Sequence, residues 1–279
     1  MIIGDMHLKR EQAREKVLAA IKKHNGTTLL ATGVAGDDAR LALAAVQAGA
    51  CMLEPNHPAL ALARGYKGVT KMHDAEELRH EITIQQMAEV INGIKNVVGN
   101  EIFITVGAPG TFAEVVPTPF TLEDAVMLSK AGADGLHTHK VTMEDLKDVV
   151  DTAHAAGLLV DAYIAHPDDT HLFGIPAETP EEVASIAKEM ENIGVDFIGL
   201  MTGMSYEGVV AGEIAQPIRE RVEALVNAVS VPTLAEGGIN LDNYKAFLEI
   251  GVDIIVVGTA IDDMAKNAVK NVVETLLER

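Results

Sequence analysis

One pattern of apolar and polar positions recurs along the chain. A stretch with apolar residues at helical spacing ends at a glycine, and a short continuous apolar run follows at once, as in segments 130–137, 192–199 and 249–256. A glycine in that place ends a helix in the left-handed conformation, and a continuous apolar run suits a parallel strand that is buried on both faces. The pattern therefore predicts successive helix–strand units.

The pattern predicts eight strands in all. They are expected near residues 28–32, 50–54, 101–106, 135–139, 158–163, 196–201, 232–236 and 253–258. Amphipathic stretches predict helices between them, for example over 121–131, 142–156, 180–193 and 262–277, and an extra helix over 10–23 before the first strand. Eight alternations favour a closed (β/α)8 TIM barrel over an open doubly wound sheet, formed as one domain by residues 1–279.

The connections that follow the predicted strands are longer and richer in glycine, proline and polar residues than those that precede them. They span residues 33–38, 107–119, 165–176 and 202–212. Barrel enzymes keep their active sites at this end of the strands, although such loops are also places where insertions are tolerated. The longest excursion, 55–100, is expected to hold two helices, with Lys67 and Lys71 between them on the solvated surface.

Two turns near the end of the chain carry the most informative motif. Gly237 and Gly238 follow the seventh predicted strand, and Gly258 and Thr259 follow the eighth. Each turn leads into a helix and leaves backbone N–H groups free, which is how proteins hold a phosphate against a helix N-terminus. The two turns are expected side by side, so they predict a phosphate-binding cradle.

The fourth predicted strand carries a pair of histidines. His137 and His139 point the same way because side chains at i and i+2 share one face of a strand. That face is directed either into the barrel mouth or against the surrounding helices. Two imidazoles at this spacing can ligate one divalent metal ion or act as acid and base; the structural alternative is a pair of hydrogen-bonded core histidines.

Three carboxylates are expected close to the same end of the barrel. Asp161 lies inside an apolar strand, where an unpaired carboxylate costs several kcal/mol, so it needs a partner and can hold an imidazole in one tautomer. Glu54 ends the second predicted strand and Glu236 ends the seventh. From those positions both can reach a ligand bound at the centre.

Composition and charge limit the kinds of molecule that the protein is expected to bind. The 22 basic and 41 acidic residues give a net charge of −19, which argues against nucleic acid and anionic membranes and requires local groups to hold a phosphorylated ligand. The single cysteine excludes an intrachain disulfide, and neither a membrane span nor the apolar core of a signal peptide is found. We expect a cytoplasmic protein, and a homo-oligomer because many such barrels associate.

The motif Leu-Ala-Glu-Gly-Gly-Ile at 234–239, followed by Val-Val-Gly-Thr-Ala-Ile at 256–261, resembles the ribulose-phosphate-binding barrel superfamily, nearest to the N-acetylmannosamine-6-phosphate 2-epimerases. Segment 195–203 is similar to the sixth strand and loop of that family. The resemblance implies that Glu236 is the acidic catalytic residue, and that phosphate is bound by Gly237, Gly238, Gly258 and Thr259. The family's catalytic lysine on an early strand has no match in segments 50–54 and 102–106.

These features predict an enzyme that acts on a small phosphorylated sugar or related carbonyl compound. The reaction is proton abstraction or carbon–carbon cleavage next to the carbonyl, by an isomerase, epimerase or lyase. Glu236 is the expected base, His137 or His139 the acid or metal ligand, and Asp161 the residue that orients an imidazole. A divalent metal is an optional cofactor. The alternatives are a metal-dependent hydrolase that uses His137 and His139, and a non-catalytic barrel that binds a phosphorylated ligand.

Overall fold

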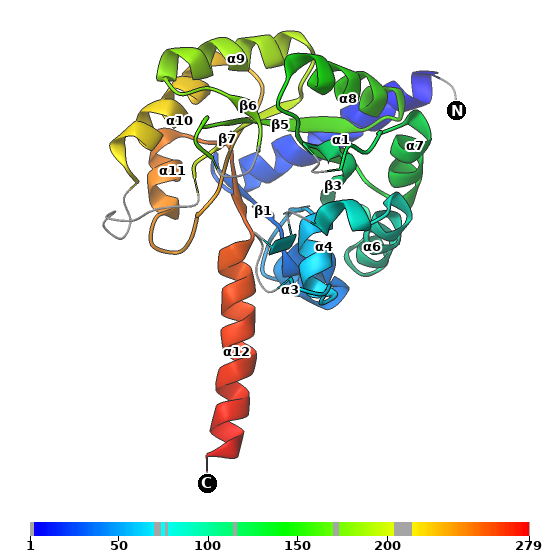
Figure 1. The fold of residues 1–279 in the computed structure, drawn as a ribbon, viewed down its shortest axis with the longest axis vertical. Helices are drawn as coiled ribbons and strands as arrows, with labels where there is room; N and C mark the ends of the chain where they lie inside the picture. The colour runs from blue at the N-terminus through cyan, green and yellow to red at the C-terminus, as the bar shows by residue number, and fades with distance from the viewer. Residues whose placement is uncertain are drawn as a thin grey trace.

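The computed structural model describes residues 3–69, 74–75, 78–113, 116–169, 173–203 and 214–278. Lys71 and most of the predicted connection 202–212 lie outside the described residues. Within the described part, parallel strands form a closed barrel, because β1 pairs with both β2 and β9 and β4 pairs with β5 (Figure 1). The predicted TIM barrel is therefore confirmed.

The barrel strands follow the predicted order. They are β1 (Thr28–Ala31), β2 (Met52–Leu53), β3 (Phe103–Phe112), β4 (Gly135–His139), β5 (Leu159–Ala165), β7 (Phe197–Met201), β8 (Thr233–Glu236) and β9 (Ile254–Val257). Beyond small shifts at several strand ends, two differences from the expected bounds are larger. β3 continues to Phe112 through a shift in its register with β4, and a short β6 (Ile175–Pro176) pairs with the end of β5. Both extensions use residues that were expected to be loop, so they build up the wall of the mouth.

Helices surround the strands, as Figure 1 shows. They are α1 (Ile3–Lys23), α2 (Val34–Asp37), α3 (Ala39–Gln47), α4 (His57–Ala63), the 3-10 helix η1 (Arg79–Glu81), α6 (Ile84–Val98), α7 (Leu122–Ala131), α8 (Met143–Ala155), α9 (Pro180–Asn192), α10 (Gln216–Ala228), α11 (Tyr244–Ile250) and α12 (Thr259–Leu277). Local signals set several starts: Thr83, Thr121 and Thr179 each form a capping box at the beginning of a helix.

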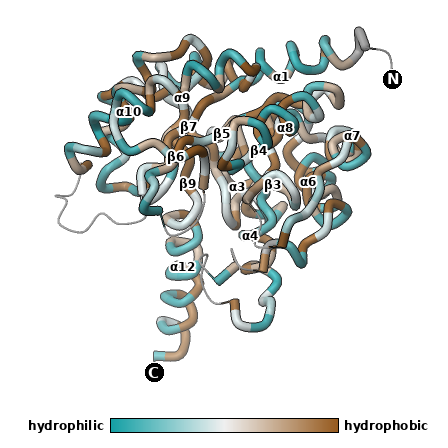
Figure 2. The backbone as a smooth tube through the Cα atoms, turned by 45° about the horizontal axis from the view of Figure 1, so that its top comes forward, coloured by the Kyte–Doolittle hydropathy of each residue, from teal (hydrophilic) through white to brown (hydrophobic). Residues whose placement is uncertain are grey.

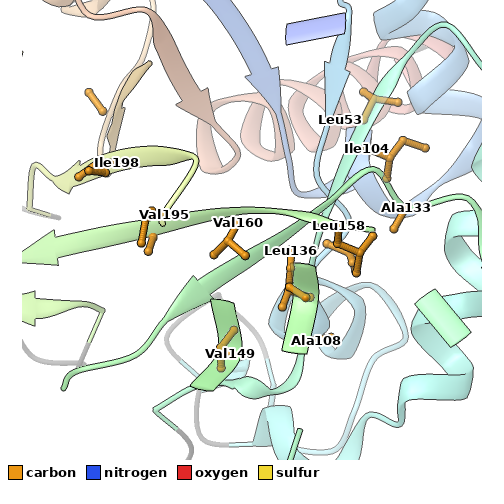
Figure 3. Close-up of a cluster of buried hydrophobic side chains, with 14 of the residues drawn as sticks. Leu53, Ile104, Ala108, Ala133, Leu136, Val149, Leu158, Val160, Val195 and Ile198 are labelled. Carbon is orange, nitrogen blue, oxygen red and sulfur yellow. The ribbon is translucent and has the colours of Figure 1, made fainter. Parts of the chain in front are cut away.

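The core has two layers. The outer layer lies between strands and helices, where Leu136 and Val160 on the strands and Val149 on α8 belong to one buried cluster (Figure 3). The inner layer fills the barrel with larger side chains, among them Phe103 and Tyr163. Gly199 makes room for the Tyr163 ring, because a Cβ at that position would lie 2.3 Å from Tyr163 Cε1. The interior is therefore a packed core rather than a pore.

Helix α1 closes the end of the barrel where the strands begin. Ala13, Val17 and Ala20 are buried in the inner cluster. On either side of them, Arg14 reaches Asp196 at 2.5 Å and Lys16 reaches Asp134 at 2.8 Å. Helix α1 thus covers the end of the barrel where the described strands begin.

The glycine-to-strand junctions that recur in the sequence have a structural role at this closed end. Asp134, Asp196 and Asp253 stand just before β4, β7 and β9, and each accepts a backbone N–H from a neighbouring strand, at 3.1, 3.0 and 2.8 Å respectively. The aspartates thus tie adjacent strands together at their first residues.

Helix α12 departs from the barrel. It extends away from the body of the molecule (Figure 1), and every residue from 266 to 278 is exposed. Across the described residues, no helix is long and apolar enough to cross a membrane.

Candidate active site

A pocket opens at the carboxyl ends of the barrel strands. The side chains of Glu54, His137, His139 and Glu236 line it, from the ends of β2, β4 and β8. The histidine face that the sequence left undetermined is therefore directed into the mouth. Barrel proteins bind and convert their ligands at this end, because loops that differ in sequence converge there on a rigid scaffold.

His137 is held by Asp161. The two residues pair across β4 and β5, and His137 Nδ1 lies 2.5 Å from Asp161 Oδ1. The other carboxylate oxygen of Asp161 accepts the Thr105 hydroxyl at 2.6 Å. Since an ionised carboxylate only accepts hydrogen bonds, Nδ1 of His137 carries the proton and its Nε2 faces the pocket.

His139 is held in the same way by a main-chain oxygen. Its Nδ1 contacts the carbonyl oxygen of Phe173, which can only accept, so Nδ1 is the donor. The Nε2 atoms of His137 and His139 then lie 2.7 Å apart. Around this pair, Glu54 Oε1 is 3.7 Å and Glu236 Oε2 is 3.9 Å from His137 Nε2.

The electrostatics of this cluster are unusual. Burial by itself lowers the pKa of His137, but the carboxylates of Glu54 and Asp161 outweigh it and raise the pKa to about 10. Burial raises the pKa of Glu54 to about 8, although the charge of His137 opposes that shift. Glu54 is 1% exposed, and its Oε2 accepts no hydrogen bond from any described residue. A buried polar atom left in this way points to a missing partner.

Three of these residues can hold a metal ion. One ligand atom from each of His137, His139 and Glu236 lies within 4.8 Å of the others. Imidazole nitrogens and a carboxylate oxygen are the donors that divalent transition metals use in proteins. The arrangement is therefore able to serve either as an acid–base centre or as a metal centre.

The predicted phosphate cradle forms part of the same pocket. Gly237 and Gly238 have φ angles of 105° and 69°, which suit glycine, and Gly258 precedes the first turn of α12 without a side-chain cap. The N–H groups of Gly238, Gly258, Thr259 and Ala260 donate to no described residue. The acid that would cap them, Asp262, instead accepts the N–H of Val34 at 2.8 Å. The amides therefore remain available to an anion.

The structure thus brings together His137, His139, Asp161 and Glu236, and sets them beside the two glycine turns. His166, the histidine that follows β5, lines a different pocket with Asp169, and Lys67 is exposed. The sequence placed Glu54 at the mouth without naming a partner; in the structure its Oε1 accepts a hydrogen bond from Asn56 Nδ2 at 3.2 Å and lies near His137. Thr105 and the Phe173 carbonyl carry no sequence signal, because a threonine in a strand and a main-chain oxygen in a loop are too common to single out.

A closed parallel barrel with its polar pocket at the carboxyl ends of the strands defines a TIM-barrel protein. No family model matches the chain. The chain is 36% identical over 89 residues to a phosphoribosyl imidazole-4-carboxamide isomerase of Methanosphaera stadtmanae, covering 32% of this chain and 35% of the relative. It is also 36% identical over 90 residues to thiamine-phosphate synthase of Pyrococcus abyssi, covering 32% and 42%.

A solved structure matches over nearly the whole chain. A putative phosphonomutase from Burkholderia cenocepacia superposes with a TM-score of 0.63 and 18% identity, covering 94% of this chain and 99% of that one, which shows the shared fold. The alignments span about a third to two fifths of the length of the two curated relatives. The chain is therefore a TIM barrel distantly related to a phosphoribosyl imidazole-4-carboxamide isomerase and a thiamine-phosphate synthase.

Proposed function

We propose that this protein is an enzyme for a small phosphorylated sugar or related carbonyl compound. It removes a proton, or cleaves a carbon–carbon bond, next to the carbonyl, as an isomerase, epimerase or lyase. The observation that carries this proposal is the position of the open amides of Gly238, Gly258 and Thr259 in the same pocket as the histidine pair. The similarity to a phosphoribosyl imidazole-4-carboxamide isomerase and to a thiamine-phosphate synthase supports it.

The geometry supports a simple proton cycle. The phosphate binds to the amides at the start of α12, and the carbonyl end of the substrate extends toward His137 and His139. A mouth carboxylate takes the proton from the carbon next to the carbonyl; Glu236 is the base expected from the sequence, and Glu54 is the other carboxylate beside His137. Protonated His137 stabilises the oxygen of the resulting enediolate, and return of the proton to another face or carbon completes the reaction.

The test is solvent exchange, which reports proton removal whatever the product is. Sugar phosphates are incubated with the protein in D2O, and deuterium incorporation next to the carbonyl is followed by NMR. With an active compound in hand, Glu236→Gln is expected to lower kcat by roughly 10² to 10⁴, the usual contribution of one positioned base. Glu123→Gln, which removes the same charge from an exposed site on α7, is the control. Absence of exchange and of thermal stabilisation across the panel contradicts the proposal.

One observation favours the metal-dependent hydrolase as a second candidate. His137, His139 and Glu236 form a group able to hold a metal ion, which hydrolases of this fold also need. Release of inorganic phosphate or of an amine by the metal-loaded protein, without solvent exchange, would favour this candidate. Exchange without hydrolysis favours the isomerase or lyase.

We also propose that the chain forms a homo-oligomer through α12. Apolar residues recur every three or four positions along this helix, and brown and teal segments alternate along it in Figure 2. Six large apolar side chains of α12 are about half exposed or more: Met264, Val269, Val272, Val273, Leu276 and Leu277. The exposed area of these six residues is on the order of 700 Å² per copy, so a two-fold contact that buries both sets removes about 1,400 Å² from water, within the range of a stable dimer interface.

Light scattering coupled to size exclusion tests the oligomer. The unmodified protein is expected to be a dimer or larger, and Val269→Glu with Leu276→Glu a monomer. Asn267→Glu with Asn271→Glu places the same charges on the polar side of α12 and is expected to leave the assembly intact. The proposed assembly through α12 is refuted if the unmodified protein is a monomer. It is also refuted if the variant with Val269→Glu and Leu276→Glu still assembles.

A further inference from the structure

The hydrogen bonds of the two histidines determine what lies between them. His137 donates from Nδ1 to Asp161, and His139 donates from Nδ1 to the carbonyl of Phe173. In its neutral form each ring has a single N–H, so both Nε2 atoms present lone pairs. These atoms lie 2.7 Å apart and point at one another. Two lone pairs at that distance repel unless a cation lies between them.

A proton on one Nε2 removes this repulsion but does little for the surrounding acids. Glu54 and Glu236 both approach His137 Nε2 within 4 Å, while Asp161 occupies the other nitrogen. Glu54 Oε2 stays buried without a hydrogen bond from any described residue. Among the described residues that line the pocket there is no lysine or arginine. Three carboxylates thus lie around the two imidazoles with no basic side chain among the described lining residues, a setting that favours a divalent cation.

We propose that a divalent first-row transition-metal ion binds at the mouth of the barrel, with His137 Nε2, His139 Nε2 and a carboxylate oxygen of Glu236 as its ligands. Asp161 and the Phe173 carbonyl are positioning groups: each takes the Nδ1–H of a ligand histidine and so directs Nε2 to the ion. Imidazole donors select Zn²⁺, Co²⁺ or Fe²⁺ over Mg²⁺ and Ca²⁺, which prefer oxygen.

The distances suit such an ion. Two nitrogens bound to one ion at about 2.1 Å stand about 3.0 Å apart in octahedral and about 3.4 Å apart in tetrahedral geometry, so the histidine rings need to separate by less than about 1 Å. The carboxylate of Glu236 already lies within 4.8 Å of both. Three protein ligands leave a coordination position open to the pocket, which is typical of a catalytic rather than a structural site.

A bound metal ion would give Glu54 and Glu236 different roles in catalysis. This assignment of roles rests on the proposed function. With the ion bound, a lone pair of Glu236 is committed to the metal, so the role of base moves from Glu236 to Glu54. The charge of the ion favours the ionised form of Glu54, whose Oε2 has no partner among the described residues. Glu54 takes the proton from the carbon next to the carbonyl. The electron pair of the broken C–H bond forms the carbon–carbon double bond of an enediolate, and the π pair of the carbonyl moves to its oxygen. A bound ion would stabilise the charge on that oxygen until Glu54 returns the proton. No electron is gained or lost overall.

Metal binding is tested without any substrate. The full-length protein is treated with chelator, and Zn²⁺, Co²⁺, Mn²⁺ and, as a hard-ion control, Mg²⁺ are titrated by calorimetry. One equivalent of a transition ion is expected to bind, and the visible spectrum of the Co²⁺ form reports its nitrogen and oxygen ligands. His139→Gln and Glu236→Gln are expected to weaken binding at least a hundredfold. Asp161→Asn is expected to weaken it about 10- to 100-fold with the stoichiometry kept.

His166→Gln is the matched control, because His166 lies in another pocket and its loss is expected to leave binding unchanged. Circular dichroism and thermal melting of the apo forms verify that each variant is folded. Absence of transition-metal binding, binding of Mg²⁺ alone, or an unchanged affinity in the His139 variant overturns the assignment. If the protein binds the metal ion but catalyses no solvent exchange, the metal site is supported and the proposed function is refuted. With exchange present, Glu54→Gln is expected to abolish exchange and keep the metal.

Discussion

Both ends of the barrel bury acidic side chains, but the two ends differ in how completely these side chains are paired. At the closed end, Asp134 is bound by Lys16, Lys95 and a backbone N–H, and Asp196 is bound by Arg14, His154 and a backbone N–H. At the mouth, three carboxylates surround one imidazole, and Glu54 keeps an oxygen without a hydrogen bond from any described residue.

The difference separates acids that stabilise the fold from acids that are kept for a ligand. A fully paired buried carboxylate stabilises the chain around it, whereas an incompletely paired one costs free energy of folding. Such a cost persists where a ligand or reaction requires it, so perturbed carboxylates cluster at functional sites. The fold stability of this barrel is therefore expected to depend on its closed end and its chemistry on the mouth.

The largest expected effect on stability is at the closed end. Asp196→Ala leaves the exposed Arg14 and the partly buried His154 without their acid, and it removes the acceptor of the buried Val160 N–H. We expect the free energy of unfolding to fall by about 3 kcal/mol, measured by urea denaturation. Asp151→Ala breaks an exposed pair with Lys147 and is the control, with an expected change of about 0.5 kcal/mol or less. Equal losses in the two variants would contradict the contrast between the ends.

A smaller effect is expected where the inner core meets the mouth. Gly199→Ala places a Cβ 2.3 Å from Tyr163 Cε1, so the ring must shift, and we expect a loss of about 1–3 kcal/mol of unfolding free energy together with weaker ligand binding. Gly93→Ala on α6 meets no atom within 4 Å and is expected to stabilise the protein by about 0.5–1 kcal/mol. Thermal melts of the two variants should therefore move in opposite directions.

The smallest expected effect is at Glu54. Its substitution is expected to stabilise the protein, whereas Asp196→Ala destabilises it, and the size of the effect depends on pH. Burial raises the pKa of Glu54 to about 8, so between its ordinary value and pH 8 the folded state retains a proton that the unfolded state releases. The stability of the chelator-treated protein therefore falls as the pH rises through this window. Glu54→Gln removes that dependence and is expected to stabilise the apo protein at pH 7 by on the order of 1 kcal/mol, and less at pH 5. A destabilised variant at pH 7 would show that Glu54 is a structural acid like Asp196.

Much of the fold was predictable from local patterns. The glycine junctions located β4, β7 and β9, and the helices α7, α8 and α9 begin and end within one or two residues of the expected bounds. The bounds of β3 were wrong, since Gly107 to Phe112 contains the glycine, proline and threonine of a loop. These residues continue the strand because their neighbours in β4 supply hydrogen-bond partners, and a pattern along one strand contains no information about the next.

The sequence alone predicted that His137 and His139 share one face, because side chains two residues apart in a strand point the same way. Which way that face points, and what it meets, depends on closure of the barrel, which brings β2, β5 and β8 to the same mouth. The 2.7 Å approach of the two imidazoles, the position of Glu54 and the acceptor at Phe173 follow from that closure. Side-chain spacing is set by neighbours in the chain, whereas convergence is set by contacts between residues far apart in it.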